Sequence, residues 1–388
     1  MPSENKFIIL SPHSVLKNLE ESYLFDIEND ELYELNIDAY QFLLRISRGE
    51  SPPVRKEDEE FIRFCLSENL IAFSETPSQK KISLNPSPIP SLRYLELQIT
   101  DRCNLQCRHC YIGEGFHQDL SKNRIQKVFE EFEEIQGLRL LLSGGEPLLH
   151  SCFWEINDLL RNYSFRTVLL SNGTLVTKTV AKRLRVYEVQ VSLDGMKEGH
   201  ESLRGKGTFE KTMAAIDHLQ EANLRVSVAT MIHRKNFTEF DQLASLLQSK
   251  NIEEWNVDVP CVEGRLKTNQ DVWVAPSEAG RYLSYGYGGG FHGSTNNSTC
   301  GVHLCAIISN GAVCKCGLFS QEPVGSIEEG LRTCWARIPR IPLKDLKCKC
   351  PVMEDCRGGC RYRAKIQGNL IQPDLFQCYA RGVLKGGE

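Results

Sequence analysis

The stretch that decides the fold is Thr100-Asp101-Arg102-Cys103-Asn104-Leu105-Gln106-Cys107-Arg108-His109-Cys110-Tyr111. Its cysteines have the spacing CxxxCxxC and directly follow the alternating run 94–100, which predicts a strand. Thiolates spaced in this way along one loop can converge on one metal centre, and iron–sulfur clusters are held by such thiolates. A fully ligated four-iron cluster takes four cysteines, so three leave one iron open to a small molecule. The alternatives are buried thiols or a zinc knuckle, although zinc sites usually combine a CxxC pair with a second, distant pair.

These residues resemble the cysteine loop of the radical S-adenosylmethionine (SAM) superfamily. The resemblance implies that Cys103, Cys107 and Cys110 hold a [4Fe–4S] cluster whose open iron binds SAM. It also implies that the reduced cluster cleaves SAM to a 5′-deoxyadenosyl radical, which removes a hydrogen atom from the substrate. Family members usually have an aromatic residue before the third cysteine, where this chain has His109. With the motifs below, the resemblance extends over roughly residues 93–378.

The composition sets bounds on the function. A chain of 388 residues is long enough for two or three domains, and its 41% hydrophobic and 25% charged residues are ordinary for a globular protein. The net charge of −4 argues against a general nucleic-acid binder. There is no apolar run of membrane-spanning length and no signal-peptide core. Sixteen cysteines without a secretion signal favour a reducing compartment, so the sequence predicts a cytoplasmic protein with no nucleic-acid or membrane partner.

Residues 1–75 predict a small α+β domain. Strands are expected at 6–10, 22–28, 31–35 and 70–73, and helices at 37–46 and 57–69. A small sheet followed by helices resembles the RiPP recognition element, a winged-helix-like domain that holds the leader of a ribosomally made peptide by pairing it with an open sheet edge. The alternative is a docking or folding cap without a separate function. Residues 76–91 contain four prolines and have the composition of a linker.

Residues 92–290 alternate strands with helices. Strands are expected at 94–100, 138–143, 167–171, 188–193, 226–232 and 255–259, and helices at 121–136, 153–162, 177–185, 208–222 and 238–249. Repeated βα units predict a parallel sheet with helices outside, in the α/β class. Six units resemble the partial (β/α)6 TIM-like barrel of radical SAM enzymes. Active sites of barrels gather at the carboxyl ends of the strands, where the remaining motifs fall.

Four strand ends carry candidate cofactor-binding residues. In the family, a GGEP segment receives the amino group of SAM, and here this segment is Gly144, Gly145, Glu146 and Pro147. The glycines allow close approach of a ligand, and the carboxylate can accept a hydrogen bond from an ammonium. The next strand ends carry Ser171 and Asn172, then Ser192 and Asp194, and Tyr111 resembles the aromatic residue near the adenine. Each of these alone is also an ordinary turn signal.

Two residues are weaker candidates for catalysis. Arg204 lies in His200-Glu-Ser-Leu-Arg-Gly-Lys-Gly-Thr-Phe209, which resembles a stretch common in peptide-modifying members of the family. The guanidinium of Arg204 would either stabilise a carboxylate or order the loop at the end of the strand. Cys261 follows the sixth strand and is a candidate radical partner, although a small core thiol is the commoner case.

Residues 291–388 resemble the SPASM domain, which holds two auxiliary [4Fe–4S] clusters. A density of ten cysteines between 300 and 378 in itself predicts metal binding. The resemblance assigns Cys300, Cys305, Cys316 and Cys360 to the first cluster, and Cys348, Cys350, Cys356 and Cys378 to the second. Cys314 competes with Cys316 for one place. The family opens the second group with CxxC, whereas this chain has one residue between Cys348 and Cys350, so Cys348 departs from the pattern.

Together these resemblances predict a radical SAM maturase with three [4Fe–4S] clusters. It would oxidatively modify a ribosomally synthesised precursor peptide by forming a thioether or carbon–carbon crosslink, with a reductant such as flavodoxin or ferredoxin. The second hypothesis keeps the radical chemistry and changes the substrate to a tetrapyrrole, a small molecule or a protein side chain, as in sulfatase maturation. The third is a non-catalytic iron–sulfur electron carrier or peptide chaperone, which would yield no 5′-deoxyadenosine.

Overall fold

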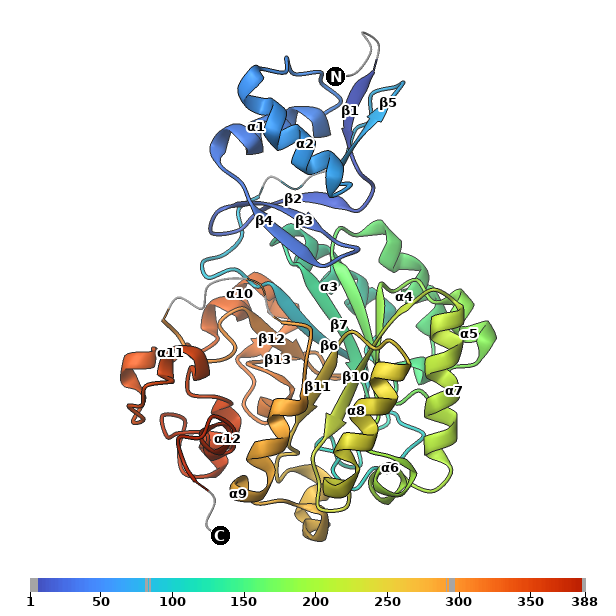
Figure 1. Cartoon of the computed structure of the whole chain (residues 1–388), viewed down its shortest axis with the longest axis vertical. Coiled ribbons are helices and arrows are strands. Elements are labelled where there is room, and N and C mark those ends of the chain that lie inside the picture. Colours follow the sequence, from blue (N-terminus) through green and yellow to red (C-terminus); the bar gives the residue numbers. More distant parts are fainter. Residues whose placement is uncertain (1–5, 81–82, 84, 291, 293–296, 386–388) are drawn as a thin grey trace.

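A nine-stranded sheet is the centre of the computed structural model, which describes residues 6–80, 83, 85–290, 292 and 297–385. Its strands follow the order β11-β10-β9-β8-β7-β6-β12-β13-β14. The six strands of this sheet that come first in the chain are parallel, and each pairs with the next. They are β6 (Tyr94–Thr100), β7 (Arg139–Gly144), β8 (Arg166–Ser171), β9 (Glu188–Ser192), β10 (Arg225–Met231) and β11 (Trp255–Asp258). This sequential order confirms the predicted partial (β/α)6 barrel (Figure 1).

Helices cover the outside of the barrel. They are α3 (Lys122–Glu134), α4 (Phe153–Leu159), α5 (Lys178–Arg183), α6 (Lys197–Arg204), α7 (Thr208–Glu221) and α8 (Phe240–Ser249). In α3, Ile125, Val128, Phe129 and Phe132 recur three and four residues apart and are fully buried against the sheet. The sequence predicts all of these helices except α6, which is formed by the stretch around His200. None of the helices in the described ranges combines the length and apolar content that crossing a membrane requires.

The N-terminal region contains two small antiparallel sheets and two helices. Strand β1 (Phe7–Leu10) pairs with β5 (Ile71–Ser74), and the three-stranded sheet is β2 (Ser14–Asn18), β3 (Ser22–Asp26) and β4 (Glu31–Glu34), followed by α1 (Ile37–Ser47) and α2 (Glu59–Ser67). The strands predicted at 22–28 and 31–35 form the hairpin β3–β4. The sequence analysis missed β2, because its first four residues are all buried and therefore show no alternation between apolar and polar side chains.

The N-terminal region docks on the barrel through buried polar contacts. Arg166, at the start of β8, is fully buried, pairs with Glu188 at 2.9 Å, and donates to the carbonyls of Ile27 and Glu28 at 2.8 and 2.7 Å. Asp30, in the β3–β4 turn, forms an ion pair with Arg139 at the start of β7. These contacts are at the amino ends of the barrel strands, so this region covers the end of the barrel opposite the cysteine loop (Figure 1).

The tail continues the barrel sheet. Strand β12 (Leu304–Ile307) pairs in parallel with β6, and β13 (Ala312–Cys314) and β14 (Gly325–Ser326) extend it antiparallel. Its helices are α10 (Leu331–Arg337), α11 (Met353–Cys356), α12 (Arg361–Ile366) and α13 (Leu375–Ala380), and α13 contacts the short barrel-side helix α9 (Pro276–Ala279). The boundary predicted at residue 290 thus separates two segments that share one sheet.

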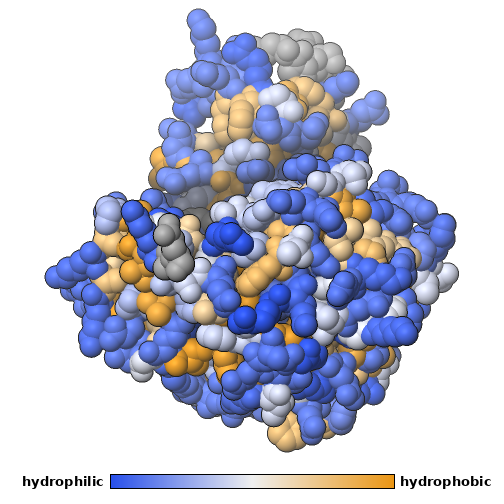
Figure 2. Space-filling model, turned by 60° about the horizontal axis from the view of Figure 1, so that its bottom comes forward, coloured by the Kyte–Doolittle hydropathy of each residue, from blue (hydrophilic) through white to orange (hydrophobic). Residues whose placement is uncertain are grey.

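The face opposite the N-terminal region is largely hydrophilic, with scattered apolar patches (Figure 2).

Candidate functional site

The cysteine loop is anchored directly after β6. The carboxylate of Asp101 accepts from the backbone N–H groups of Phe116 and Gln118 at 2.7 Å each, and Arg102 forms an ion pair with Asp119. These contacts fix both ends of the loop, so the three cysteines are held at the carboxyl end of β6.

The three thiols of the loop lie close to one another. Burial, together with the smaller effect of the nearby charges of Glu146, Cys107 and Cys110, raises the pKa of Cys103 to about 11. Thiols with such pKa values stay protonated at neutral pH unless a cation binds them. Cys107 is buried and its pKa is also raised by burial. The loop therefore suits a positively charged metal centre that holds the thiolates.

The GGEP segment packs directly on this loop. The N–H of Gly145 donates to the carbonyl of Thr100, and that of Glu146 to the carbonyl of Arg102, both at 2.9 Å. A Cβ at Gly144 would lie 2.3 Å from the Thr100 oxygen, and one at Gly145 would lie 2.4 Å from the Arg102 oxygen. Glycine at both positions therefore allows the close contact between the ends of β6 and β7, whether or not a ligand also approaches there.

Glu146 is the buried carboxylate of the site. Its oxygens accept from the hydroxyl of Ser171 at 3.0 and 3.1 Å and from the N–H of Asn172 at 2.9 Å. Burial raises the pKa of Glu146 to about 7. The structure therefore joins three of the predicted cofactor-binding residues into one group, in which Ser171 and Asn172 orient a carboxylate that an ammonium ion would stabilise. Pro147 follows as the first residue of a short 3₁₀ turn.

The end of β8 also touches the cysteine loop. The side-chain amide of Asn172 donates to the side chain of Asn104 at 3.0 Å, and Asn104 donates to the hydroxyl of Thr174 at 2.8 Å. The same Asn172 amide lies 3.9 Å from the sulfur of Cys103. Residues at three neighbouring strand ends thus meet at one point, as the sequence predicts.

Asp194 and Arg204 form a buried ion pair beside the loop. The Asp194 carboxylate accepts from Arg204 and, at 2.7 Å, from the N–H of Met231. Although burial opposes its charge, the pKa of Asp194 is well below its usual range because Arg204 lies beside it. The guanidinium of Arg204 reaches to 4.0 Å from the sulfur of Cys107. Asp194 therefore orients the positive charge of Arg204 toward the cysteine loop. Ser192, the other residue predicted at the end of β9, is half-buried.

A second polar group faces the barrel interior, and the sequence analysis missed two of its members, Glu96 and Gln98. The hydroxyl of Tyr111 accepts from Gln98 at 2.9 Å and donates to the carboxylate of Glu96 at 3.3 Å. Glu96 also accepts from Ser143 at 3.4 Å. The sequence of β6 contains a signal for this group, since its polar residues alternate with leucine and isoleucine. Alternate residues of a barrel strand face the interior, so these polar side chains share one face.

This polar group lies between the cysteine loop and the tail. A Cβ at Gly317, which follows Cys316, would lie 2.9 Å from the Tyr111 hydroxyl and 3.0 Å from a Glu96 oxygen. The pKa of Tyr111 is raised well above its usual range, chiefly by burial and then by the charges of Glu96, Cys110 and Cys316. Tyr111, predicted as an adenine neighbour, thus lies near a cysteine of the loop and a cysteine of the tail.

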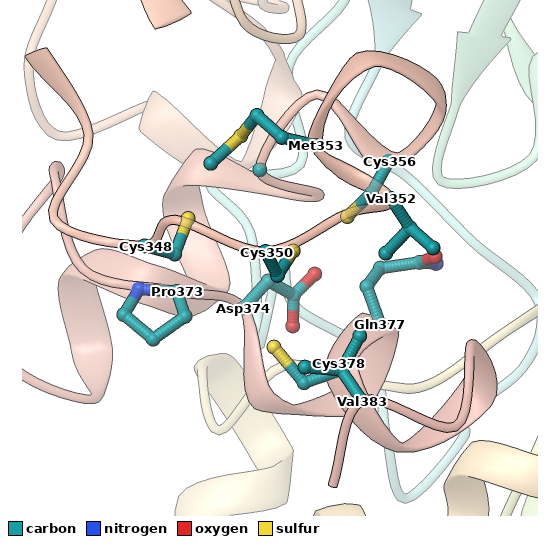
Figure 3. A pocket seen from close by; sticks show the side chains of 11 residues that line it. Cys348, Cys350, Val352, Met353, Cys356, Pro373, Asp374, Gln377, Cys378 and Val383 are labelled. Atoms are coloured by element: carbon teal, nitrogen blue, oxygen red, sulfur yellow. The ribbon is translucent and has the colours of Figure 1, made fainter. Parts of the chain in front are cut away.

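In the tail, the structure brings together the four cysteines assigned to the second auxiliary cluster. Cys348, Cys350, Cys356 and Cys378 line one small cavity between α11 and α13, and their sulfur atoms point toward it (Figure 3). Burial, together with the smaller effect of the charges of the other three cysteines, raises the pKa of Cys378 to about 11. Cys348 lines this cavity despite its departure from the usual spacing.

The first auxiliary group differs from the expectation. Cys300, Cys316 and Cys360 line a cleft of about 670 Å³ between the barrel and α12. Cys305 does not join them. It lies on β12 opposite Leu95 of β6 and is fully buried in the apolar core with Cys334. The spacing in the sequence does not show that β12 enters the barrel sheet, and this pairing turns the Cys305 side chain into the core.

The geometry does not match a mononuclear metal site. Among the residues that the structure describes, no three His, Cys, Asp or Glu side chains converge closely enough to hold a single ion. The ligands of a four-iron cluster bind separate irons and stand farther apart than the ligands of one zinc ion.

Comparison with known proteins identifies the class of enzyme. Residues 97–247 match the Radical SAM superfamily. The chain therefore contains a radical SAM domain, the domain of a class of enzymes that uses SAM and a four-iron cluster.

Its relatives act on different substrates. The AdoMet-dependent heme synthase of Methanosarcina barkeri is 26% identical over 345 residues, covering 75% of this chain and 97% of that protein. The mycofactocin maturase MftC of Mycolicibacterium smegmatis is 31% identical over 159 residues, covering 39% of this chain and 41% of that protein.

Two solved structures share the fold. Streptococcus suis SuiB bound to its precursor peptide SuiA superposes with a TM-score of 0.66 at 13% identity, over 95% of this chain and 99% of that one. The anSMEcpe enzyme with bound AdoMet and the Kp18Cys peptide gives a TM-score of 0.60 at 18% identity, over 74% of this chain and 94% of that one. SuiB thus resembles this chain over nearly its whole length, N-terminal region included.

Proposed function

We propose that this chain is a radical SAM maturase that oxidatively crosslinks a ribosomally synthesised precursor peptide. The observation that carries the radical chemistry is the buried carboxylate of Glu146, held by Ser171 and Asn172 beside the cysteine loop. In this proposal Cys103, Cys107 and Cys110 hold the cluster, and Glu146 receives the amino group of SAM. When bound, the two cofactors supply on reduction a carbon radical that removes a hydrogen atom from the substrate.

The interior residues complete the oxidation. Forming a thioether or carbon–carbon crosslink removes two hydrogen atoms from the peptide in total. One leaves as the abstracted hydrogen atom, and the other leaves as a proton and an electron. Glu96 is a suitable proton acceptor, because its carboxylate faces the barrel interior between the cysteine loop and the tail. In this proposal the electron passes to a cluster held by tail cysteines, of which Cys316 lies near enough to Glu96 for the two charges to interact.

The N-terminal region supplies a surface for the leader peptide. Strand β4 pairs with β3 on one side only among the described residues, so its outer edge is open to an added strand. Two exposed apolar side chains belong to the helices beside this strand: Ile37, which is 74% exposed and begins α1 three residues after β4, and Phe64, which is 43% exposed and contacts Tyr33 of β4. An extended leader with apolar side chains would cover both.

The position of this region constrains the peptide. The open edge belongs to the domain at the amino end of the barrel strands, whereas the cysteine loop is at the carboxyl end. The seven residues of β6 span about 23 Å at about 3.3 Å each. An extended peptide advances roughly the same distance per residue, so the modified residue would follow the leader contact by at least about seven residues.

A peptide-binding experiment tests this proposal. The probe is a labelled short peptide encoded beside this gene, and its dissociation constant is measured by fluorescence anisotropy. We expect I37D and F64D to weaken binding at least about tenfold, since each places a charge in an apolar contact. The matched control is I89D, because Ile89 is 80% exposed in the linker. Deleting the whole N-terminal region is a poorer test, because that would leave Arg166 and Glu188 uncovered at the base of the barrel.

A tetrapyrrole substrate is the second candidate. It is favoured by the similarity to the heme synthase, which extends over 97% of that relative. Iron coproporphyrin III is a suitable probe, since a relative named Fe-coproporphyrin III synthase is 30% identical over 161 residues. If the porphyrin, and not the peptide, increases the yield of 5′-deoxyadenosine from SAM and dithionite, the peptide proposal is wrong while the radical chemistry stands.

A further inference from the structure

The cleft between the barrel and the tail holds three of the four cysteines expected there. Cys300, Cys316 and Cys360 line it, and Cys305 is directed into the barrel core on β12. A four-iron cluster with full protein ligation needs a fourth thiolate. The structure thus leaves one ligand position of the first auxiliary site to be assigned.

Cys261 lies close to two of these three cysteines. It follows β11, the last barrel strand, and is 7% exposed. It packs in one buried cluster with Phe319 and Tyr362, and Cys316 and Cys360 border the same cluster. This cysteine thus reaches the tail group from the barrel side, which no spacing pattern in the sequence indicates.

The neighbouring groups are less suitable. Cys314 is a buried member of the same apolar cluster, but beyond burial its pKa is raised only by Glu96. The thiol of Cys261, in contrast, lies near enough to Cys360 and Cys316 for their charges to raise its pKa. Asp258, on the cleft wall, is paired with Arg363. His303 is hydrogen-bonded to the carbonyl of Ser91 at 2.8 Å. Of these side chains, only Cys261 combines a soft ligand with proximity to two of the three cysteines.

We propose that Cys261 is the fourth ligand of the auxiliary [4Fe–4S] cluster held by Cys300, Cys316 and Cys360. This inference rests on the proposed function, because it takes the tail to hold clusters. The thiol loses its proton when it binds iron, as the other three do. Such ligation fastens the last barrel strand to the tail and positions the cluster beside the polar group of Tyr111 and Glu96.

Iron content and spectroscopy test the assignment without any substrate. The background is the full chain with Cys103, Cys107 and Cys110 replaced by alanine, reconstituted anaerobically. In it, C261S should lose about one iron per chain and give the electron paramagnetic resonance (EPR) signal of an oxidised three-iron cluster, because one corner of the cubane has lost its thiolate. The matched controls C305S and C314S, both fully buried thiols, should keep the iron content and spectrum of the background.

Several outcomes overturn the assignment. Unchanged iron and spectrum in C261S would mean a three-thiolate cluster, and loss of iron in C305S or C314S in its place would identify a different ligand. If the background binds no iron at all, the tail holds no cluster and the proposed function fails in that part. Should C261S not fold, a crystal structure of the reconstituted wild-type chain decides, since continuous density between the Cys261 sulfur and an iron is expected and its absence refutes the proposal.

Discussion

The hydroxyl of Tyr111 donates to the carboxylate of Glu96 inside the barrel, at 3.3 Å. Tyr111 directly follows the third cysteine of the loop, and Glu96 lies on the strand that leads into it. This contact connects the cysteine loop to the barrel interior at the position where Gly317 of the tail comes closest. A substrate held there would be in reach of both the loop and the tail, with one carboxylate to accept its proton.

Replacing Glu96 by glutamine should separate the radical step from the later proton loss. In E96Q, cleavage of SAM by dithionite should continue, whereas formation of crosslinked peptide should fall at least about 100-fold, the usual loss on removing a general base. Liquid chromatography with mass spectrometry measures 5′-deoxyadenosine and the peptide product in one sample. The control is S143A, which removes only the weaker 3.4 Å contact to Glu96. Equal crosslinking by E96Q and the parent enzyme would exclude Glu96 as the proton acceptor.

SAM binding should depend on pH through Glu146. Burial raises the pKa of this carboxyl from 4.5 to about 7 in the chain without SAM. Below pH 7 the group becomes protonated and no longer attracts an ammonium, so the affinity should fall by up to about tenfold per pH unit. Above pH 7 the carboxyl of Glu146 stays charged, so it contributes no further change in affinity. Isothermal titration of the reconstituted enzyme with SAM between pH 5.5 and 8.5 measures this profile.

The E146Q variant is the complement to that experiment. A neutral amide has no proton to gain, so the variant should bind SAM weakly and with little pH dependence. E155Q is the matched control, because Glu155 is 57% exposed and pairs with Lys122 at the surface. A pH profile in E146Q as steep as in the parent chain would show that another group titrates.

Arg204 should set the reduction potential of the cluster held by the loop. Its guanidinium is 4.0 Å from the Cys107 sulfur, and a nearby positive charge favours the more negative, reduced cluster. At an effective dielectric constant of about 20 a unit charge about 4 Å away is worth roughly 4 kcal/mol and one about 8 Å away roughly 2 kcal/mol, so R204Q should lower the potential by on the order of 100 mV. EPR-monitored titration measures the shift. R234Q, at a surface arginine that is 52% exposed, should leave the potential unchanged.

Much of this site could be predicted from the sequence because local features determine it. The cysteine loop, the GGEP segment and the residues Ser171 and Asn172 each follow a strand, and successive parallel strands bring their ends together. The contact between Glu146 and Ser171 follows from that placement once the strand order is known.

The misassigned residue depends on long-range pairing. Cys305 has a spacing that suits a cluster ligand, but β12 joins the barrel beside β6, some two hundred residues away in the chain, and the register then directs its side chain into the core. A one-residue shift in register would reverse that direction, and no local pattern reports it. Cys261, in contrast, reaches the tail only because the barrel brings the end of β11 there.

The buried contact between the N-terminal region and the barrel should dominate the stability of that interface. In R166M, two carbonyls of the N-terminal region lose their donor and the carboxylate of Glu188 loses its closest cationic partner, around a guanidinium that is fully buried in the parent chain. Breaking a buried ion pair from one side costs about 3–5 kcal/mol, so chemical denaturation should show a loss of that size in the free energy of unfolding. R161M, at an exposed arginine on the same side of the barrel, should change it by less than about 0.5 kcal/mol. Similar stabilities of the two variants would mean that the N-terminal region is held to the barrel mainly by its apolar contacts.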